Sequence, residues 1–539
     1  MTGPLPCAKM LAMIPLPSRQ PPLAAQIRPA HARDKVRYDD AQMRVIECQD
    51  PIVVAEAFAG AGKTTTAVGF TEARPNTRFL YLCFNRANAQ EARLRFGPHV
   101  ECKTSHALAW AAVGRKYGSQ IVQGGWRARQ LAEEVNISDV RTAAIAQSIL
   151  LSFFASPDRA ITEEHAQDAR QQYAATDAEI GRAMDVARFA WNAMRTPGGT
   201  ISVPHDAYLK VWALSKPKLP FEHIILDEAQ DTNPVMVDLV RQQKHAKLLL
   251  IGDRHQSIYG FRKAYNAMEL FSAMGATVLK IPRTWRFGPN IAQVANALLS
   301  HFKDEDTAII GAGPSSPMSP GCARAVLSRT NAGLFREAAE VRGKGVYWVG
   351  GVESYHIDQL MDAWHLKCGK ISAIVSPALR KYRSWYEFLE EAATTKDPES
   401  RLLIRFIETY HSDTPDLVRA FREHALPDPS RAKLILATAH KSKGLDFDRV
   451  VIGEDFECIA KAQQALLDSP LEPLQENLRQ EINLLYVAVT RAKHKLELNA
   501  ETQEFLQNFK RYQNDLHQAR SRTQSDACNE HEFEQETVT

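Results

Sequence analysis

The sequence predicts an α/β protein built on two parallel β-sheets, each carrying a mostly helical insertion. Short apolar runs rich in Val, Ile and Leu alternate with helix-compatible stretches, and this alternation is typical of parallel strands covered by helices. The runs are PIVVAEAF (51–58), RFLYLCF (78–84), HIILDE (223–228), KLLLIGD (247–253), TVLKIP (277–282), ARAVLSR (323–329), KLILATA (433–439) and RVVIGED (449–455). At 539 residues the chain is long enough for three or four domains with separate cores.

The first strand-like run leads into a loop of small residues that is typical of a phosphate cradle. AFAGAGKT, residues 57–64, places Gly60 and Gly62 just before Lys63 and Thr64, and a helix-compatible stretch follows. In such loops, backbone N–H groups and the amino end of the helix face phosphate oxygens, lysine spans the β- and γ-phosphates, and threonine ligates Mg²⁺. The loop therefore predicts ATP and Mg²⁺ as cofactors, with a purely structural turn as the alternative.

Two polar strings follow later strand-like runs. DEAQD (227–231) comes after HIIL, and GDRHQSIYGFR (252–262) comes after KLLLI. Because parallel strands end at one sheet edge, where phosphate sites form, Asp227 and Glu228 are expected beside the cradle. For DEAQD alone, a solvated acidic loop is the alternative.

Two stretches interrupt the strand rhythm. Residues 111–205 are Ala-rich and helix-forming, with Thr176 and Glu179 predicted to form a capping box. Residues 340–430 also have mostly helical patterns, such as WYEFLEEAA and LLIRFIETY. Both are expected to be helical insertions.

Taken in order, these motifs resemble the UvrD/Rep group (superfamily 1A) of DNA helicases, whose first motif is AxAGxGKT, so Ala57 fits. The likeness runs from Gln42 to Arg491. Its other motifs are CKTSHALA (102–109), TWRFGPNI (284–291), SRTNA (328–332), LATAHKSKGLDFDRVV (436–451) and NLLYVAVTRAK (483–493). The wording is closest to the F-box DNA helicase branch, although no room is expected for an F-box before residue 40.

The resemblance implies two RecA-like P-loop NTPase domains with parallel sheets. The implied organisation is domain 1A at 37–110 and 206–278, insertion 1B at 111–205, domain 2A at 279–339 and 431–510, and a reduced insertion 2B at 340–430. Residues 1–36 are expected to be a disordered leader, with a targeting segment or a misassigned start as alternatives. Residues 511–539 are polar, with few aliphatic side chains, and are expected to be a disordered tail.

The resemblance also implies a catalytic set. Lys63 would bind phosphates, Thr64 and Asp227 would hold Mg²⁺, and Glu228 would orient and deprotonate the attacking water. Gln256 would sense the γ-phosphate, while Arg286 and Arg491 would reach over from the second sheet, with surface salt bridges as their alternative. The implied cofactor-binding residues are Gln42, Ala57, Phe58, Ala59, Gly60, Ala61, Gly62, Lys63, Thr64, Thr65, Trp285 and Asp446.

Three of these positions concern the base and ribose of the nucleotide. Gln42 resembles the adenine-reading glutamine of the family. Trp285 stands where the family has Tyr, so it is an aromatic platform or else a core indole. Asp446 stands where the family has Glu and is one methylene shorter.

Single-stranded DNA and single-strand/duplex junctions are the expected partners, and the implied DNA contacts come from both halves. They are Phe84, Asn85, Arg86, Thr104, His106, Tyr259, Phe261, Arg329, Thr438 and His440. Total charge is nearly balanced, with 66 Lys and Arg against 63 Asp and Glu. Between Arg78 and Arg129, however, nine Lys and Arg face two acids, which marks either a strand-contacting region or a solvated basic helix face.

The resemblance thus implies a 3′–5′ DNA helicase driven by ATP, in DNA repair or recombination. A translocase that strips bound proteins from single strands without unwinding, or an RNA-directed motor, remains open; an inactive binding module or small-molecule P-loop enzyme is disfavoured by the full motif set. Eight cysteines form no CxxC pair, and no apolar run is long enough for a membrane span. A reducing, cytoplasmic location is expected, nucleoid-associated if the source is bacterial, and protein partners are not indicated.

Overall fold

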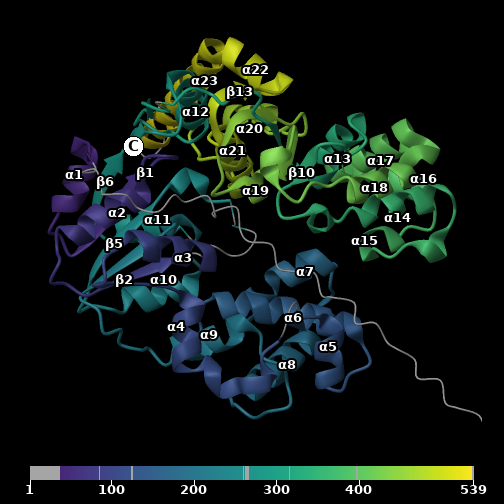
Figure 1. Cartoon of the computed structure of the whole chain (residues 1–539), viewed down its shortest axis with the longest axis horizontal. Coiled ribbons are helices and arrows are strands. Elements are labelled where there is room, and N and C mark those ends of the chain that lie inside the picture. The colour runs from purple at the N-terminus through teal and green to yellow at the C-terminus, as the bar shows by residue number, and fades with distance from the viewer. Residues whose placement is uncertain are drawn as a thin grey trace, which may run out of the picture.

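Two parallel sheets organise the chain into two lobes, each with a group of helices at its outer side (Figure 1). The computed structural model describes residues 37–83, 85–122, 126–258, 260, 266–314, 316–395 and 398–536. The predicted α/β class with parallel sheets is confirmed. The expected leader, residues 1–36, lies outside the described residues.

The first sheet has six parallel strands. In spatial order they are β3 (Val100–Thr104), β2 (Phe79–Cys83), β4 (His223–Asp227), β5 (Lys247–Gly252), β1 (Ile52–Ala57) and β6 (Thr277–Ile281). Strand β1 lies between β5 and β6, with Val54 opposite Leu250 on one side and Val278 on the other. Because every pairing is parallel, the segments that follow β1, β4 and β5 leave the sheet at the same edge.

The second sheet has five parallel strands. In spatial order they are β10 (Val346–Trp348), β11 (Leu434–Thr438), β9 (Arg324–Ser328), β12 (Phe447–Ile452) and β13 (Ala492–Glu497). Strand β10 lies inside 340–430, the span expected to be insertion 2B, yet it pairs with β11. Its three residues are too few for a period-2 pattern to be recognised in the sequence. Strands β7 (Arg283–Thr284) and β8 (Ile310–Gly311) form a separate parallel pair.

Helices around the first sheet fall into two groups. Those near the sheet are α1 (Asp40–Glu47), α2 (Lys63–Glu72), α3 (Arg86–Arg95), α10 (Pro234–Arg241) and α11 (Ala267–Ala273). The outer group is α4 (Ser105–Ala112), α5 (Ala128–Glu134), α6 (Val140–Ala155), α7 (Gln167–Tyr173), α8 (Asp177–Met194) and α9 (His205–Leu214). The capping box predicted at Thr176 and Glu179 starts α8.

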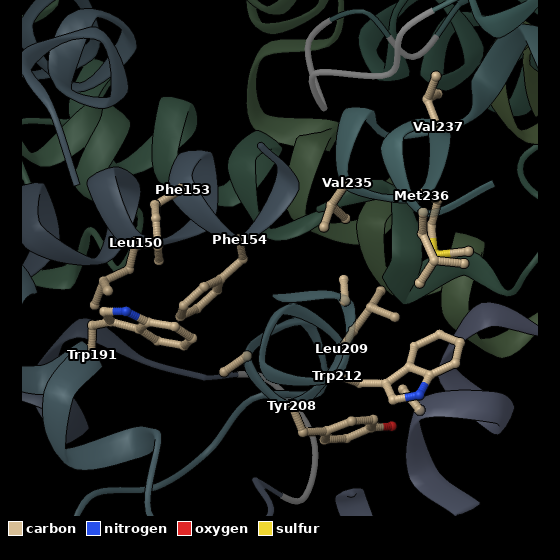
Figure 2. Packing of buried hydrophobic residues seen from close by; sticks show 14 of the residues in the cluster. Leu150, Phe153, Phe154, Trp191, Tyr208, Leu209, Trp212, Val235, Met236 and Val237 are labelled. Carbon is tan, nitrogen blue, oxygen red and sulfur yellow. The ribbon is translucent and has the colours of Figure 1, made fainter. Parts of the chain in front are cut away.

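The outer helices share one hydrophobic core with the sheet. Phe153 and Phe154 of α6 pack on Trp191 of α8, and the same cluster includes Trp212 of α9 (Figure 2). Leu80 of β2 also belongs to this cluster. A second cluster covers the other face of the sheet. Since apolar burial is continuous, the helical group is held firmly against the sheet.

The second sheet is also covered on both faces. One cluster lies under α12 (Pro289–Phe302), α19 (Ala439–Ser442), α20 (Ile459–Asp468), α21 (Glu476–Val489) and α22 (Ala500–Gln507). The other face carries a helical group: α13 (Asn331–Glu340), α14 (Asp358–Lys367), α15 (Pro377–Arg380), α16 (Trp385–Thr395), α17 (Pro398–Tyr410) and α18 (Thr414–Glu423).

The end of the chain differs from the sequence expectation. Residues 511–536, expected to belong to a disordered tail at 511–539, lie in helix α23 (Phe509–Glu536), which begins directly after α22. Leu516 is buried and Tyr512 packs on the same core, while Arg520 pairs with Asp304 at 3.0 Å. Phe509 packs on this core as well, so three apolar anchors and one ion pair dock a helix whose polar composition gives only a weak signal.

The two lobes touch through the loop after β1. Phe58 and Ala59 leave the first sheet, yet they pack in the core of the second lobe. The cleft between the sheets is therefore closed at this point. Within the described residues, no helix combines the length and apolarity that a bilayer crossing requires.

Candidate nucleotide site and nucleic-acid interface

The loop between β1 and α2 has the backbone shape of a phosphate cradle. Gly60 and Gly62 both have positive φ, 73° and 80°, which side chains with a Cβ adopt rarely. Gly62 directly precedes α2, so the unpaired N–H groups of Lys63 and Thr64 lie at the helix amino end. This arrangement can bind an anion.

Close approach by the second lobe also restricts this loop. A Cβ at Gly60 would lie 2.5 Å from the Arg286 Cβ and 2.6 Å from the Thr284 hydroxyl oxygen. The Trp285 backbone N–H donates to the Gly60 carbonyl at 3.0 Å. Only glycine fits here, and the contact brings Arg286 beside the cradle.

Lys63 meets the acidic string that follows β4. Its Nζ donates to Glu228 Oε2 at 2.9 Å. Glu228 has φ 51°, an unusual left-handed conformation for a residue with a side chain, and such strain is often kept at functional sites. The lysine predicted to bind phosphates and the carboxylate predicted to act as the base are thus paired with each other.

Burial and charge push the two acidic groups in opposite directions. Burial and the neighbouring Glu228 carboxylate raise the pKa of Asp227, and Lys63 offsets this only in part. Burial also acts on Glu228, but Lys63 and Lys443 outweigh it and lower the pKa of Glu228. The two adjacent carboxyls therefore have separated pKa values, so that Glu228 carries its charge more readily than Asp227.

Gln256 lies at the centre of a hydrogen-bond network between the lobes. Its amide donates to Asp253 Oδ2 at 2.7 Å, and the same oxygen accepts from the Tyr486 hydroxyl at 2.9 Å. Tyr486 in turn accepts from the Ala59 N–H at 3.3 Å. Arg491 donates to Gln256 Oε1 at 3.3 Å. One network therefore links the cradle, the loop after β5 and helix α21.

Arg286 and Arg491 both lie in the cleft. Arg286 donates to the Thr490 carbonyl at 3.1 Å and lies 3.9 Å from Asp446. Arg491 is buried; burial and repulsion from Arg286 lower the pKa of Arg491 to about 9. Burial also lowers the pKa of Arg286, and Glu228 offsets part of the lowering for both guanidinium groups. The guanidinium groups of Arg286 and Arg491 repel each other, so this part of the cleft carries positive charge that a bound anion would neutralise.

The remaining nucleotide-site candidates line the same loop or its rim. Gln42 donates to the Ala61 carbonyl at 3.3 Å and is held by a capping box with Asp39. Trp285 is 50% exposed, so the core-indole alternative does not hold. Asp446 also lies 3.4 Å from Lys493. Ala57 and Ala61 are buried, Thr64 is half-buried, and the Thr65 hydroxyl accepts from Arg95 at 2.8 Å.

The DNA-contact candidates of the first lobe follow β2 and β3. Asn85 caps α3 by accepting from the Asn88 N–H at 2.9 Å, and Arg86 is exposed. Thr104 caps α4, while His106 lies 2.9 Å from Asp206 Oδ1. Phe84, Tyr259 and Phe261 lie outside the described residues.

The candidates of the second lobe follow β9 and β11. Arg329 forms a two-pronged pair with Glu481, with both N–O distances 2.7 Å. Thr438 caps α19 and is 7% exposed, while His440 in the same helix is half-buried. Thus the hydroxyl of Thr438 serves the helix end, and Arg329 is occupied by a carboxylate.

Comparisons with known proteins address the family. Residues 141–273 match the UvrD/REP helicase N-terminal domain, and residues 372–503 match the UvrD-like helicase C-terminal domain. The chain belongs to the UvrD-like helicases. The matched spans contain Asp227, Glu228, Gln256 and Arg491, whereas Lys63 and Arg286 lie outside them.

Curated relatives of this UvrD-like chain carry helicase names. It is 30% identical to F-box DNA helicase 1 of Gallus gallus over 84% of the chain and 48% of the relative. It is 28% identical to F-box DNA helicase protein 1 of Schizosaccharomyces pombe over 85% of the chain and 57% of the relative. A shorter match, 25% identical over 51% of the chain and 33% of the relative, is to DNA helicase IV of Escherichia coli. The chain spans about half the length of the F-box relatives.

Sequence reasoning missed several residues that shape the cleft of this chain. Lys443, from the second lobe, binds Asp231 and the Gln256 carbonyl of the first. Burial raises the pKa of Asp231, and Lys443 offsets this in part. Lys443 stands in the KSKG string and Asp231 ends DEAQD. Both strings were recognised as motifs, but neither sequence indicates that these two residues pair with each other.

Glu305 is a second missed residue. Its buried carboxylate accepts from Lys280 at 2.8 Å and lies 3.0 Å from His255 Nε2, with Arg254 as a further partner. Hydrogen bonds from these three groups outweigh burial and hold the pKa of Glu305 far below its usual range. Glu305 therefore anchors the loop that carries Gln256. It follows α12 in a segment without a recognisable motif.

Proposed function

We propose that this chain is an ATP-driven motor that moves 3′–5′ along single-stranded DNA and unwinds duplex DNA, in DNA repair or recombination. The observation that carries the proposal is the meeting of two motif sets at one cleft. Lys63 and Glu228 come from the first sheet, and Arg286 and Arg491 come from the second lobe. The relatives are named DNA helicases, which supports the same activity.

In the proposed cycle, ATP competes with Glu228 for Lys63. The 2.9 Å ion pair neutralises both groups while no phosphate is bound. A triphosphate would draw Lys63 towards its β- and γ-oxygens and so remove the main cation that lowers the pKa of Glu228, leaving a more basic carboxylate ready to take a proton from water. The pair thus guards against a free base in the absence of substrate.

The residues around Asp227 fit a magnesium ion. Mg²⁺ prefers oxygen ligands, and the buried Asp227 carboxylate and the Thr64 hydroxyl are of this kind. The raised pKa of Asp227 indicates a carboxylate with less cationic compensation than its burial requires. When bound, the ion would neutralise phosphate charge, with Asp227 and Thr64 as its protein ligands.

Charge from the second lobe completes the proposed reaction. Arg286 and Arg491 would neutralise the transferring phosphoryl group, and such an arginine can contribute on the order of a thousandfold to turnover. Because these cations belong to the other lobe, ATP would favour closure and product release would favour opening. Repeated closure would move the lobes along a strand.

The DNA path is proposed along the carboxyl edges of both sheets. Arg86 and His106 follow strands of the first sheet, and Arg329 and Thr438 follow strands of the second. A single strand that contacts both groups would feel each change in lobe separation. The 3′–5′ direction rests on the family resemblance.

The deciding experiment measures ATPase activity and unwinding on 3′-tailed, 5′-tailed and blunt duplexes. We expect single-stranded DNA to stimulate ATP hydrolysis and only the 3′-tailed duplex to be unwound. Stimulation without unwinding would favour a translocase that strips proteins, and stronger stimulation by RNA would favour an RNA motor. ATPase activity that ignores nucleic acid would contradict the motor proposal.

A further inference from the structure

The proposed function assigns Arg329 to DNA, but in the structure the Arg329 guanidinium is bound by Glu481. Both prongs of the guanidinium are used, with Nε and Nη2 each 2.7 Å from a Glu481 oxygen. The fork of arginine matches a carboxylate and a phosphate equally well. The Glu481 carboxylate therefore stands where a DNA phosphate would bind.

The Arg329 backbone is fixed, so that only its side chain is available to change partner. Asp455 accepts from the N–H groups of Arg329 and Thr330 at 3.0 and 2.8 Å, and also from the Thr330 hydroxyl. The side chains of Arg329 and Glu481 are 36% and 30% exposed. A solvent-accessible ion pair on a fixed backbone can exchange its acidic partner at low cost.

Glu481 belongs to the helix that also reaches the nucleotide cleft. Helix α21 rises about 1.5 Å per residue, so Glu481 and the end of the helix at Val489 lie about 12 Å apart along the axis. Beyond that end, Arg491 contacts Gln256. One rigid element therefore has the Arg329 pair near its start and the proposed phosphate sensor at its end.

Helix α21 lies along the loop after β5. Asn483 donates to the Ser257 carbonyl at 2.8 Å, and Tyr486 donates to Asp253 at 2.9 Å. Further along the loop, a side chain at Gly260 would collide with Gln480. A shift of α21 would therefore be felt throughout the loop that carries Gln256.

We propose that Glu481 is a positioning residue that holds Arg329 in the absence of DNA, and that its replacement by a DNA phosphate is passed through α21 to the Gln256–Arg491 contact. DNA stimulation of ATPase would then arise from loss of this ion pair. The inference rests on the proposed DNA motor and names the contact that couples its two sites.

The test uses Glu481→Gln in the full chain, which keeps the shape of the side chain and removes its charge. Without the competing carboxylate, we expect oligo(dT) to bind about threefold tighter or more in fluorescence anisotropy at fixed salt. Basal ATPase should rise, so that the ratio of stimulated to basal rate falls by about half or more, while the rate at saturating DNA is retained.

Two further variants separate coupling from a purely structural role. Glu353→Gln breaks a similar two-pronged pair with Arg422 elsewhere in the second lobe, at 2.7 and 3.0 Å. This variant should leave the oligo(dT) affinity, the basal ATPase rate and the stimulation ratio unchanged. Glu481→Asp keeps the charge and should restore the stimulation ratio towards that of the unaltered chain.

The outcomes are distinguishable. If Glu481→Gln lowers basal and stimulated rates alike, or behaves as Glu353→Gln does, the coupling role is overturned while the motor proposal stands. If the unaltered chain shows no DNA stimulation, the motor proposal fails and the coupling role falls with it.

Discussion

The two lobes contribute opposite charge to one cleft. The first lobe supplies Asp227, Glu228 and Asp253 around a single lysine, whereas the second supplies Arg286, Lys443 and Arg491. Neither set is balanced by itself, and each lowers the electrostatic cost of burying the other. The cleft therefore forms only from both lobes together. A substitution in one lobe should impair ATP hydrolysis in a different way from a substitution in the other.

The largest effect is expected at Lys63, the cation that the first lobe contributes to this cleft. Lys63→Ala should lower ATP turnover on the order of a thousandfold or more, because the phosphates lose their charge partner and Asp227 and Glu228 are left uncompensated. Weak DNA binding should remain, as measured by anisotropy. Lys244→Ala, an exposed lysine after α10, is the control. Hydrolysis that persists in Lys63→Ala would refute the phosphate assignment.

The second lobe should fail differently. Arg491→Lys keeps a cation but loses the planar fork that also bonds Val487, Leu445 and Gln256. We expect turnover to fall about a hundredfold, while ATP affinity, measured by fluorescent-nucleotide titration, stays within a few-fold. A loss of affinity equal to the loss of turnover would show that Arg491 acts in binding only. Thermal unfolding checks that the variant is folded.

The Lys443–Asp231 ion pair joins the two lobes. Lys443→Met leaves the Asp231 carboxylate buried without its cation, which we expect to destabilise the closed arrangement by roughly 1.4 kcal/mol and so to lower kcat/KM about tenfold. Adding Asp231→Asn should recover part of this loss, because the unpaired charge is removed. If the double variant is as impaired as Lys443→Met or more so, the bridge is not the cause.

The smallest effect is expected on the DNA side. Phe261→Ala should reduce DNA affinity by roughly fivefold, about 1 kcal/mol, if one base loses its stacking partner. DNA-stimulated turnover and stepping should fall more than basal ATPase, as followed by translocation on fluorescently end-labelled oligonucleotides. Unchanged stimulation and stepping would remove the stacking role from Phe261.

Local pattern accounts for much of the architecture. Eight apolar runs predicted eight of the strands, β4 and β5 among them, and the capping box predicted at Thr176 marked the start of α8. Strand β10 and helix α23 escaped because three residues carry no period and because few apolar anchors dock a polar helix.

Most of the strands, the phosphate loop and the order of the motifs follow from the amino-acid sequence alone, since each depends on residues that are neighbours in the chain. Only the tertiary structure decided which distant groups meet. Lys443 joins Asp231 across 212 positions, and Arg329 joins Glu481 across 152. Such pairings depend on how two separately folded sheets approach each other, and no local periodicity encodes that geometry.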